Sequence, residues 1–297
     1  MQYSRKQFLM GTDINITIIS DNNPLEDIYN AFGIFYSIER EFSRFSKDSD
    51  LFLLNTKKEG VVSNRFINVL ELSMQTYRES AGFFNPLVNL KNIGYSSDFG
   101  KGIFEKKQEI NDLDLEKVGI SGNNVTLQEN QNLDLGGIVK GYTVDLVSKY
   151  LKEIGYSNFI VNAGGDISLF GVNASGTNPV VAIDNPFNAD EIFSTLEIKD
   201  KAVSTSGTYK RKWSIDDENF HHILTPESND NNNEIVSITL IADSCYVCDA
   251  YATACIAMGT EKSLDFLKKK NIDGVIIGSD GNMYSTKGMS NYNLEII

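Results

Sequence analysis

Histidine, cysteine and long apolar runs are scarce in this chain of 297 residues. It has two histidines, three cysteines and no stretch approaching the ~18 apolar residues of a membrane span. The cysteines all lie between Cys245 and Cys255, which does not resemble a disulfide framework. The apolar run from Phe8 to Met10 is also shorter than the ~7–15 residues of a signal-peptide core. The sequence therefore predicts a cytoplasmic protein, with export or membrane anchoring as the alternative if a leader has been removed ahead of Met1.

Basic residues are also fewer than acidic ones. The chain has 27 Lys and Arg against 40 Asp and Glu, a net charge of −13 with a pI near 4.7. Such a chain repels phosphate backbones and acidic lipid surfaces, which disfavours a nucleic-acid or membrane-surface role. A small anionic ligand stays possible where a metal ion or a local lysine overrides the global field.

The composition and the apolar periodicity predict a folded α+β protein. Hydrophobic residues make up 41% of the chain, an ordinary globular value. Helical spacing predicts helices over 24–41, 64–80, 141–154, 246–258 and 261–269. Strands are expected at 14–18, 159–161, 168–172, 179–184, 192–198 and 235–241, with a strand pair within 125–135 and a terminal hairpin turning at Asp280-Gly281. We expect an ordered loop at 83–104 and a hydroxyl-rich turn at 204–208. Because no regular βαβ rhythm is present, antiparallel or mixed sheets with packed helices are favoured over a doubly wound sheet.

A glycine-rich segment, Asp134–Gly141, precedes one of the predicted helices. Its three glycines let the backbone approach a ligand where free N–H groups favour an anion, and Lys140 adds positive charge. The segment is not a Walker loop, because Lys140 precedes the last glycine instead of following it. A plain glycine turn before a helix is an equally good interpretation of the pattern alone.

Asp249 and Thr253 lie four residues apart on a predicted helix, so both side chains share one face. A carboxylate and a hydroxyl offer the hard oxygens that Mg²⁺ prefers. Taken alone, a solvated Asp beside a mid-helix Thr is the more common case. The alanine-rich, largely apolar surroundings favour the metal site, since an unpartnered Asp would be costly there.

Both histidines and two of the cysteines form short motifs with less specific meaning. His221 and His222 are adjacent, so in a strand they point to opposite faces and do not form a paired metal site. Either one suits a general base, or a packed, hydrogen-bonded side chain. Cys245 and Cys248 have the redox Cys-x-x-Cys spacing, but Tyr246 and Val247 fit that role poorly, so we expect small buried packing residues.

The ordered set of these segments, spanning nearly the whole chain, resembles the ApbE family of FAD:protein FMN transferases. The matching segments are Met10-Gly11-Thr12, Phe42-Ser43-Arg44-Phe45, Pro86-Leu87-Val88, Asp134–Gly141, Asn162–Asp166, Thr205-Ser206-Gly207, His222-Ile223 with Pro226, and Asp249 with Thr253. The resemblance implies one ApbE-like domain over residues 1–297, or two intertwined lobes, with the active site in a cleft between them.

The activity that the resemblance implies is Mg²⁺-dependent transfer of FMN from FAD to a Thr or Ser hydroxyl of an acceptor flavoprotein, with release of AMP. By motif position, the metal ligands would be Gly137, Asp249 and Thr253, and His222 would help to deprotonate the acceptor. The FAD contacts would be Met10, Phe45, Phe83, Phe84, Asn85, Asp134, Lys140 and Ile223.

Several positions depart from the family pattern. Thr225 replaces an Asp, Val139 stands where Ala is usual, and Asn85 stands where Asp is common. Two alternatives stay open. One is a Mg²⁺-dependent FAD pyrophosphatase, in which water replaces the acceptor hydroxyl and the products are FMN and AMP. The other is a non-catalytic FAD-binding protein, which the altered Thr225 favours.

Overall fold

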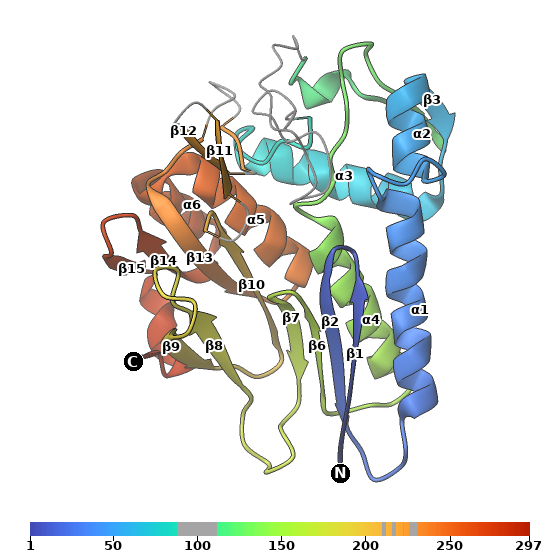
Figure 1. Ribbon diagram of the computed structural model, residues 1–297. Helices are drawn as coiled ribbons and strands as arrows, with labels where there is room; N and C mark the ends of the chain where they lie inside the picture. The colour runs from blue at the N-terminus through green and yellow to red at the C-terminus, as the bar shows by residue number, and fades with distance from the viewer. Residues whose placement is uncertain (88–111, 210–211, 216–217, 222, 226–230) are drawn as a thin grey trace.

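The computed structural model describes residues 1–87, 112–209, 212–215, 218–221, 223–225 and 231–297 (Figure 1). Its central element is an eight-stranded sheet in which every neighbouring pair of strands is antiparallel. The strands run in the order β1 (Gln2–Leu9), β2 (Thr12–Ile19), β6 (Phe159–Ala163), β7 (Asp166–Phe170), β10 (Lys201–Gly207), β13 (Ile235–Ala242), β14 (Asp273–Gly278) and β15 (Met283–Ser285).

Helices cover one face of this sheet. Helix α4 (Val139–Glu153) packs on β6 and β7, α5 (Cys245–Met258) on β10 and β13, and α6 (Thr260–Lys270) on β14. Helix α1 (Leu25–Phe42) packs against α4 and against the short α2 (Asp50–Lys57), and α3 (Asn64–Glu79) contacts α5 (Figure 1). Since α4 and α5 also contact each other, the two segments predicted to form the site lie in one layer.

The opposite face is covered by a small sheet of β8 (Val180–Asp184), β9 (Ile192–Glu197) and β16 (Glu295–Ile296), together with the 3₁₀ helix η3 (Lys287–Tyr292). Burial on both faces explains the near-continuous apolar runs of the central strands. Along β13, for example, Leu240 joins the core under the helices, whereas Ile241 joins the core under the small sheet. The described part of the chain is therefore a helix–sheet–sheet sandwich.

The remaining described elements lie outside these layers. They are the sheet of β3 (Glu59–Val61), β5 (Asn124–Thr126) and β4 (Gly119–Ser121), the 3₁₀ helix η2 (Leu115–Lys117), and the hairpin of β11 (Lys212–Ile215) and β12 (Glu218–His221). No helix in the described ranges is both long enough and apolar enough to cross a membrane.

The α+β class and the five predicted helices are confirmed, each helix to within two residues at either end. The strand pair expected within 125–135 is wrong beyond Thr126. There the backbone is satisfied by side chains instead of a partner strand: the Asn55 amide bonds both the N–H and the carbonyl of Leu133, and the Lys58 ammonium bonds the Gln131 carbonyl.

The turn expected at 204–208 is also wrong. Residues 201–207 form β10, which is hydrogen-bonded to β7 on one side and β13 on the other. The strand lies in the middle of the sheet and packs against α5, where small hydroxyl side chains leave room for the helix. Of the loop expected at 83–104, residues 88–104 lie outside the described residues.

Candidate active site between helices α4 and α5

The glycine-rich segment leads directly into α4. Within it, the Asp134 carboxylate accepts a hydrogen bond from the Gly136 N–H at 3.0 Å, and the Asp134 N–H donates to the Pro86 carbonyl at 2.7 Å. The helix then begins at Val139 without a side-chain cap, which leaves Lys140 in its first turn. Lys140 therefore stands at the positive end of the α4 dipole, a place that favours anions.

Helix α5 is buried along most of its length, and a residue of another helix caps it. Its N-cap, Ser244, makes no side-chain bond; instead the Asp145 carboxylate of α4 accepts from the N–H groups of Cys245 and Tyr246 at 2.8 and 2.9 Å. Two of the first free N–H groups of α5 are thereby satisfied. The cap fixes α5 against α4, one turn beyond Lys140.

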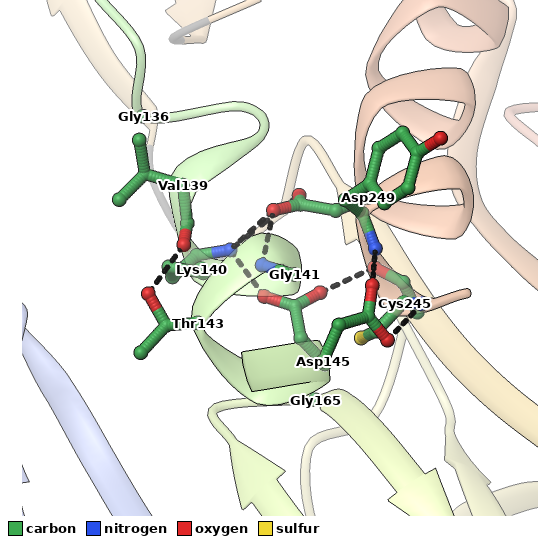
Figure 2. Close-up of polar contacts among 12 residues, drawn as sticks. Gly136, Val139, Lys140, Gly141, Thr143, Asp145, Gly165, Cys245 and Asp249 are labelled. Carbon is green, nitrogen blue, oxygen red and sulfur yellow. Dashed lines mark hydrogen bonds and ion pairs between the residues drawn. The ribbon is translucent and has the colours of Figure 1, made fainter. Parts of the chain in front are cut away.

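Three charged side chains meet between these helices and the sheet, and Figure 2 labels two of them, Lys140 and Asp249. The Lys140 ammonium forms an ion pair with Asp166, at the start of β7, and lies 3.4 and 3.5 Å from the two carboxylate oxygens of Asp249. Asp249 also accepts from the Gly141 N–H at 3.1 Å, and Asp166 accepts from the Ser204 hydroxyl. We call Lys140, Asp166 and Asp249 the charged cluster.

Gly137 and Thr253 lie beside the charged cluster and close to each other. A Cβ on Gly137 would be 3.2 Å from the Thr253 hydroxyl and 3.4 Å from the Phe84 ring. No hydrogen bond of the Thr253 hydroxyl is found within the described ranges, and the side chain is half-buried. The two segments that hold the predicted metal ligands thus lie in contact with each other.

Burial has the largest effect on the pKa of Asp249 in the charged cluster. It raises the pKa of Asp249 above its usual value, and the charge of Asp166 raises it further, while Lys140 and the Gly141 N–H lower it. Two ionised carboxylates facing one ammonium leave one unbalanced negative charge. Among the described residues no group of three or more His, Cys, Asp or Glu side chains forms a metal site. The donor set here is one buried carboxylate, a hydroxyl and backbone, which fits Mg²⁺ because that ion keeps few protein ligands.

The predicted contacts on other elements have partners of their own. Met10 occupies the β1–β2 turn with a positive φ of 54°, and its N–H donates to Glu39 at 2.7 Å. Asp134 forms an ion pair with Arg44, whose guanidinium lies 4.8 Å from the centre of the exposed Phe45 ring. Arg44 thereby links the end of α1 to the glycine-rich segment.

Residues 83–85, in the turn after α3, lie in two different environments. Phe84 is buried and reaches Gly137, as described above, whereas Phe83 and Asn85 line a cavity of about 310 Å³ together with Tyr77 and Leu113. The Asn85 amide bonds the Leu113 carbonyl at 2.9 Å, and its oxygen accepts from the Leu87 N–H at 2.9 Å. Asn85 therefore has an evident role in holding the turn.

The histidine motif is only partly described, because His222 lies outside the described residues. His221 is buried, and the side chain of Asn231 bonds its backbone N–H and carbonyl at 2.8 and 2.9 Å. The same amide bonds the carbonyl of Ile223, which is buried in the main core. The His221 imidazole Nε2 lies 3.2 Å from the Asn232 carbonyl oxygen. His221 is therefore a packed, hydrogen-bonded side chain, the second of the two roles considered from the sequence.

The cysteines are free and buried, as predicted. Burial raises the pKa of the Cys245 and Cys248 thiols far above the ordinary value, and nearby carboxylates raise it further. Their S–H groups point to strand β10, toward the carbonyls of Val203 and Ala202. Thiols held in this form do not provide the thiolate that redox exchange needs.

The α5 cap gives the stability of the protein a pH dependence. Burial raises the pKa of Asp145 from 3.8 to about 6, against the lowering effect of the Cys245 and Tyr246 N–H groups. The folded state then binds a proton more readily than the unfolded chain, so the free energy of unfolding should fall as pH rises through this window, by about 3 kcal/mol. In Asp145→Asn this contribution should vanish, as measured by thermal unfolding from pH 4 to 8.

The exposed Asp243, paired with Lys201 at the surface, provides a matched control. In Asp243→Asn the free energy of unfolding should depend on pH as it does in the wild type. If Asp145→Asn also kept the wild-type pH dependence, the Asp145 carboxylate would not be its source.

Four contributors to this region were not predicted from the sequence: Asp166, Ser204, Arg44 and Asp145. Asp166 and Arg44 stood within segments that matched the family, but neither was predicted as a site residue. A signal for Asp166 was available, since it is a lone carboxylate between two apolar strand segments. No comparable signal marked Asp145, which lies on the polar-looking stripe of an amphipathic helix.

Comparison with known proteins identifies the family of this chain. Residues 10–276 match the model of the ApbE family. The chain belongs to the ApbE family.

Two curated relatives are similar over most of the chain. The FAD:protein FMN transferase of Vibrio cholerae is 28% identical over 287 residues, covering 90% of this chain and 85% of the relative. That of Treponema pallidum is 27% identical over 318 residues, covering 97% and 88%. The chain thus spans most of the length of both proteins.

Solved structures show the same fold. The ApbE protein of Thermotoga maritima superposes with a TM-score of 0.91 at 22% identity, covering 99% of this chain and all of the other (100%). The flavin transferase ApbE of Vibrio cholerae gives a TM-score of 0.82 at 25% identity, covering 98% and 99%.

Proposed function

We propose that this protein transfers FMN from FAD to a Thr or Ser hydroxyl of an acceptor flavoprotein, with Mg²⁺ as its metal ion. The observation that supports this most directly is that Gly137 lies beside Thr253 and Lys140 beside Asp249, at the contact of α4 and α5, in a chain of the ApbE family. These residues offer a cation, a buried carboxylate and a hydroxyl at a helix N-terminus, which is a suitable setting for a diphosphate.

In the proposed reaction, the acceptor oxygen attacks the phosphorus of the FMN half of FAD. A new P–O bond forms, the bond between the two phosphates breaks, AMP leaves, and the hydroxyl proton passes to a base. The resemblance assigns the role of base to His222. Bound by Asp249, Thr253 and the Gly137 carbonyl, Mg²⁺ would neutralise charge that builds on the diphosphate oxygens. Lys140 supplies a second, fixed positive charge to the same oxygens.

The binding of the flavin is proposed from the remaining predicted contacts. Phe84 and Ile223 are buried in the main core, and Met10 and Phe83 pack against it. The partly exposed Met10 and Phe83 and the exposed Phe45 are therefore the side chains proposed to contact the isoalloxazine ring, which needs an apolar surface. Asn85 and Asp134 are proposed as polar contacts, positioned by Leu113 and Arg44 respectively.

The test is to incubate the protein with FAD, Mg²⁺ and a flavoprotein domain that bears an acceptor Thr. Flavin fluorescence that stays with the denatured acceptor, and an FMN adduct by mass spectrometry, are the expected results. Free FMN and AMP without an adduct would favour the pyrophosphatase instead. Tight FAD binding with no AMP at any Mg²⁺ concentration would favour a non-catalytic flavin-binding protein.

His222→Ala should slow transfer by about 10²–10⁴-fold, because the acceptor hydroxyl would lose its general base. The binding of FAD, measured by quenching of flavin fluorescence, should change little, since the imidazole acts on the acceptor and not on FAD. An unchanged transfer rate would remove His222 from this role.

A further inference from the structure

Asp166 is the least exposed carboxylate of the charged cluster, and the proposed reaction gives it no role. It is 2% exposed at the start of β7, and both of its oxygens are bound. One accepts from the Ser204 hydroxyl on the neighbouring strand β10, and the other forms the ion pair with Lys140. A buried carboxylate is retained only when such partners compensate its desolvation.

Lys140 lies closer to Asp166 than to Asp249. The contact to Asp166 is shorter than both contacts to Asp249, which are 3.4 and 3.5 Å. Because Asp166 is anchored in the sheet through Ser204, it holds the ammonium on the β7 side. Asp249 is held separately, through the Gly141 N–H on α4.

We propose that Asp166 is a positioning residue that holds the Lys140 ammonium and so keeps the charge of Asp249 available for a divalent cation. This inference rests on the proposed function, because it concerns the same metal site. The cluster has one net negative charge when both carboxylates are ionised, and that charge attracts the cation. Without Asp166, the ammonium of Lys140 would neutralise Asp249 and compete with the cation for it.

The test is a titration of the full-length protein with Mn²⁺ alone, with the free ion measured by electron paramagnetic resonance. Asp166→Asn keeps the size of the side chain and removes its charge, so Mn²⁺ affinity should fall by about ten-fold or more. Adding Lys140→Met removes the competing ammonium and returns the cluster to one negative charge. The double variant should therefore recover most of the wild-type affinity, although it lacks the lysine that the reaction needs.

Ser168→Ala serves as the matched control. Ser168 is a buried serine on β7, two residues beyond Asp166, and its hydroxyl donates to the Ser148 hydroxyl of α4 at 3.0 Å. Its variant should bind Mn²⁺ as the wild type does.

The outcomes separate the inference from the proposed function. Wild-type affinity in Asp166→Asn, or a double variant as weak as the single one, would overturn the positioning role, since loss of structure is not rescued by removing Lys140. If the wild-type protein itself bound no Mn²⁺, the proposed metal site would fail, and the inference with it.

Discussion

Asp249→Asn is expected to lower the rate of FMN transfer by about 10²–10³-fold at a fixed Mg²⁺ concentration. The amide keeps the shape of the side chain and can still accept from the Gly141 N–H, which bonds Asp249 at 3.1 Å. It loses the negative charge that would hold the metal ion. The measurement is the rate of acceptor flavinylation as a function of Mg²⁺ concentration.

The same substitution should not destabilise the protein at neutral or alkaline pH. Because burial and Asp166 raise the pKa of Asp249 above its unfolded value, the ionised carboxylate costs folding free energy as pH rises. A neutral amide removes this cost, so the thermal midpoint above neutral pH should stay level or increase. Loss of activity with retained stability is the pattern expected where a site is kept at the expense of stability.

Asp243→Asn, on the exposed turn just before α5, is the control for a lost negative charge near this helix. It should retain full activity and Mg²⁺ dependence. High residual activity in Asp249→Asn would mean that the metal ion is held elsewhere.

The pairing of Asp249 with Thr253 could be predicted because it is a local property. Both the four-residue spacing and the apolar surroundings are visible in the sequence, and the structure places the two residues on the buried helix α5. The closeness of Thr253 to Gly137 is not a local property of the sequence. No spacing encodes it, and only the family resemblance suggested it before the structure placed the Thr253 hydroxyl beside Gly137.

The pairing of Asp166 with Ser204 and that of Asp145 with the start of α5 could not be predicted, because both depend on the order of strands in the sheet. Asp166 and Ser204 are 38 residues apart, and they meet because β7 and β10 are neighbours in the sheet. Asp145 and Cys245 are 100 residues apart, and they meet because α4 and α5 pack on adjacent strands. The same reason explains why 204–208 was mistaken for a turn: its hydroxyl side chains are polar, but residues 204–207 are paired with β13 as part of a strand.

Gly141→Ala should destabilise the protein by about 3 kcal/mol, although alanine is the better helix former. Helices α4 and α5 approach closely here: a Cβ on Gly141 would lie 2.6 Å from the Cys245 carbonyl oxygen and 2.7 Å from the Tyr246 Cα. Since both neighbours are backbone atoms, no side-chain rotation relieves the contact, and the helices must separate. The Asp145 cap and the Gly141–Asp249 bond would be stretched together, so transfer activity should fall as well.

Gly33→Ala provides the opposite case within the same fold. Gly33 lies inside α1, is exposed, and has nothing within 4 Å of the position that a Cβ would take. There the substitution should stabilise the protein by about 1 kcal/mol, through helix propensity alone. Urea unfolding of the two variants should therefore move the midpoint in opposite directions. A Gly141→Ala protein as stable as Gly33→Ala would show that α4 and α5 are not in contact at this glycine, and the site proposed at their contact would have to be abandoned.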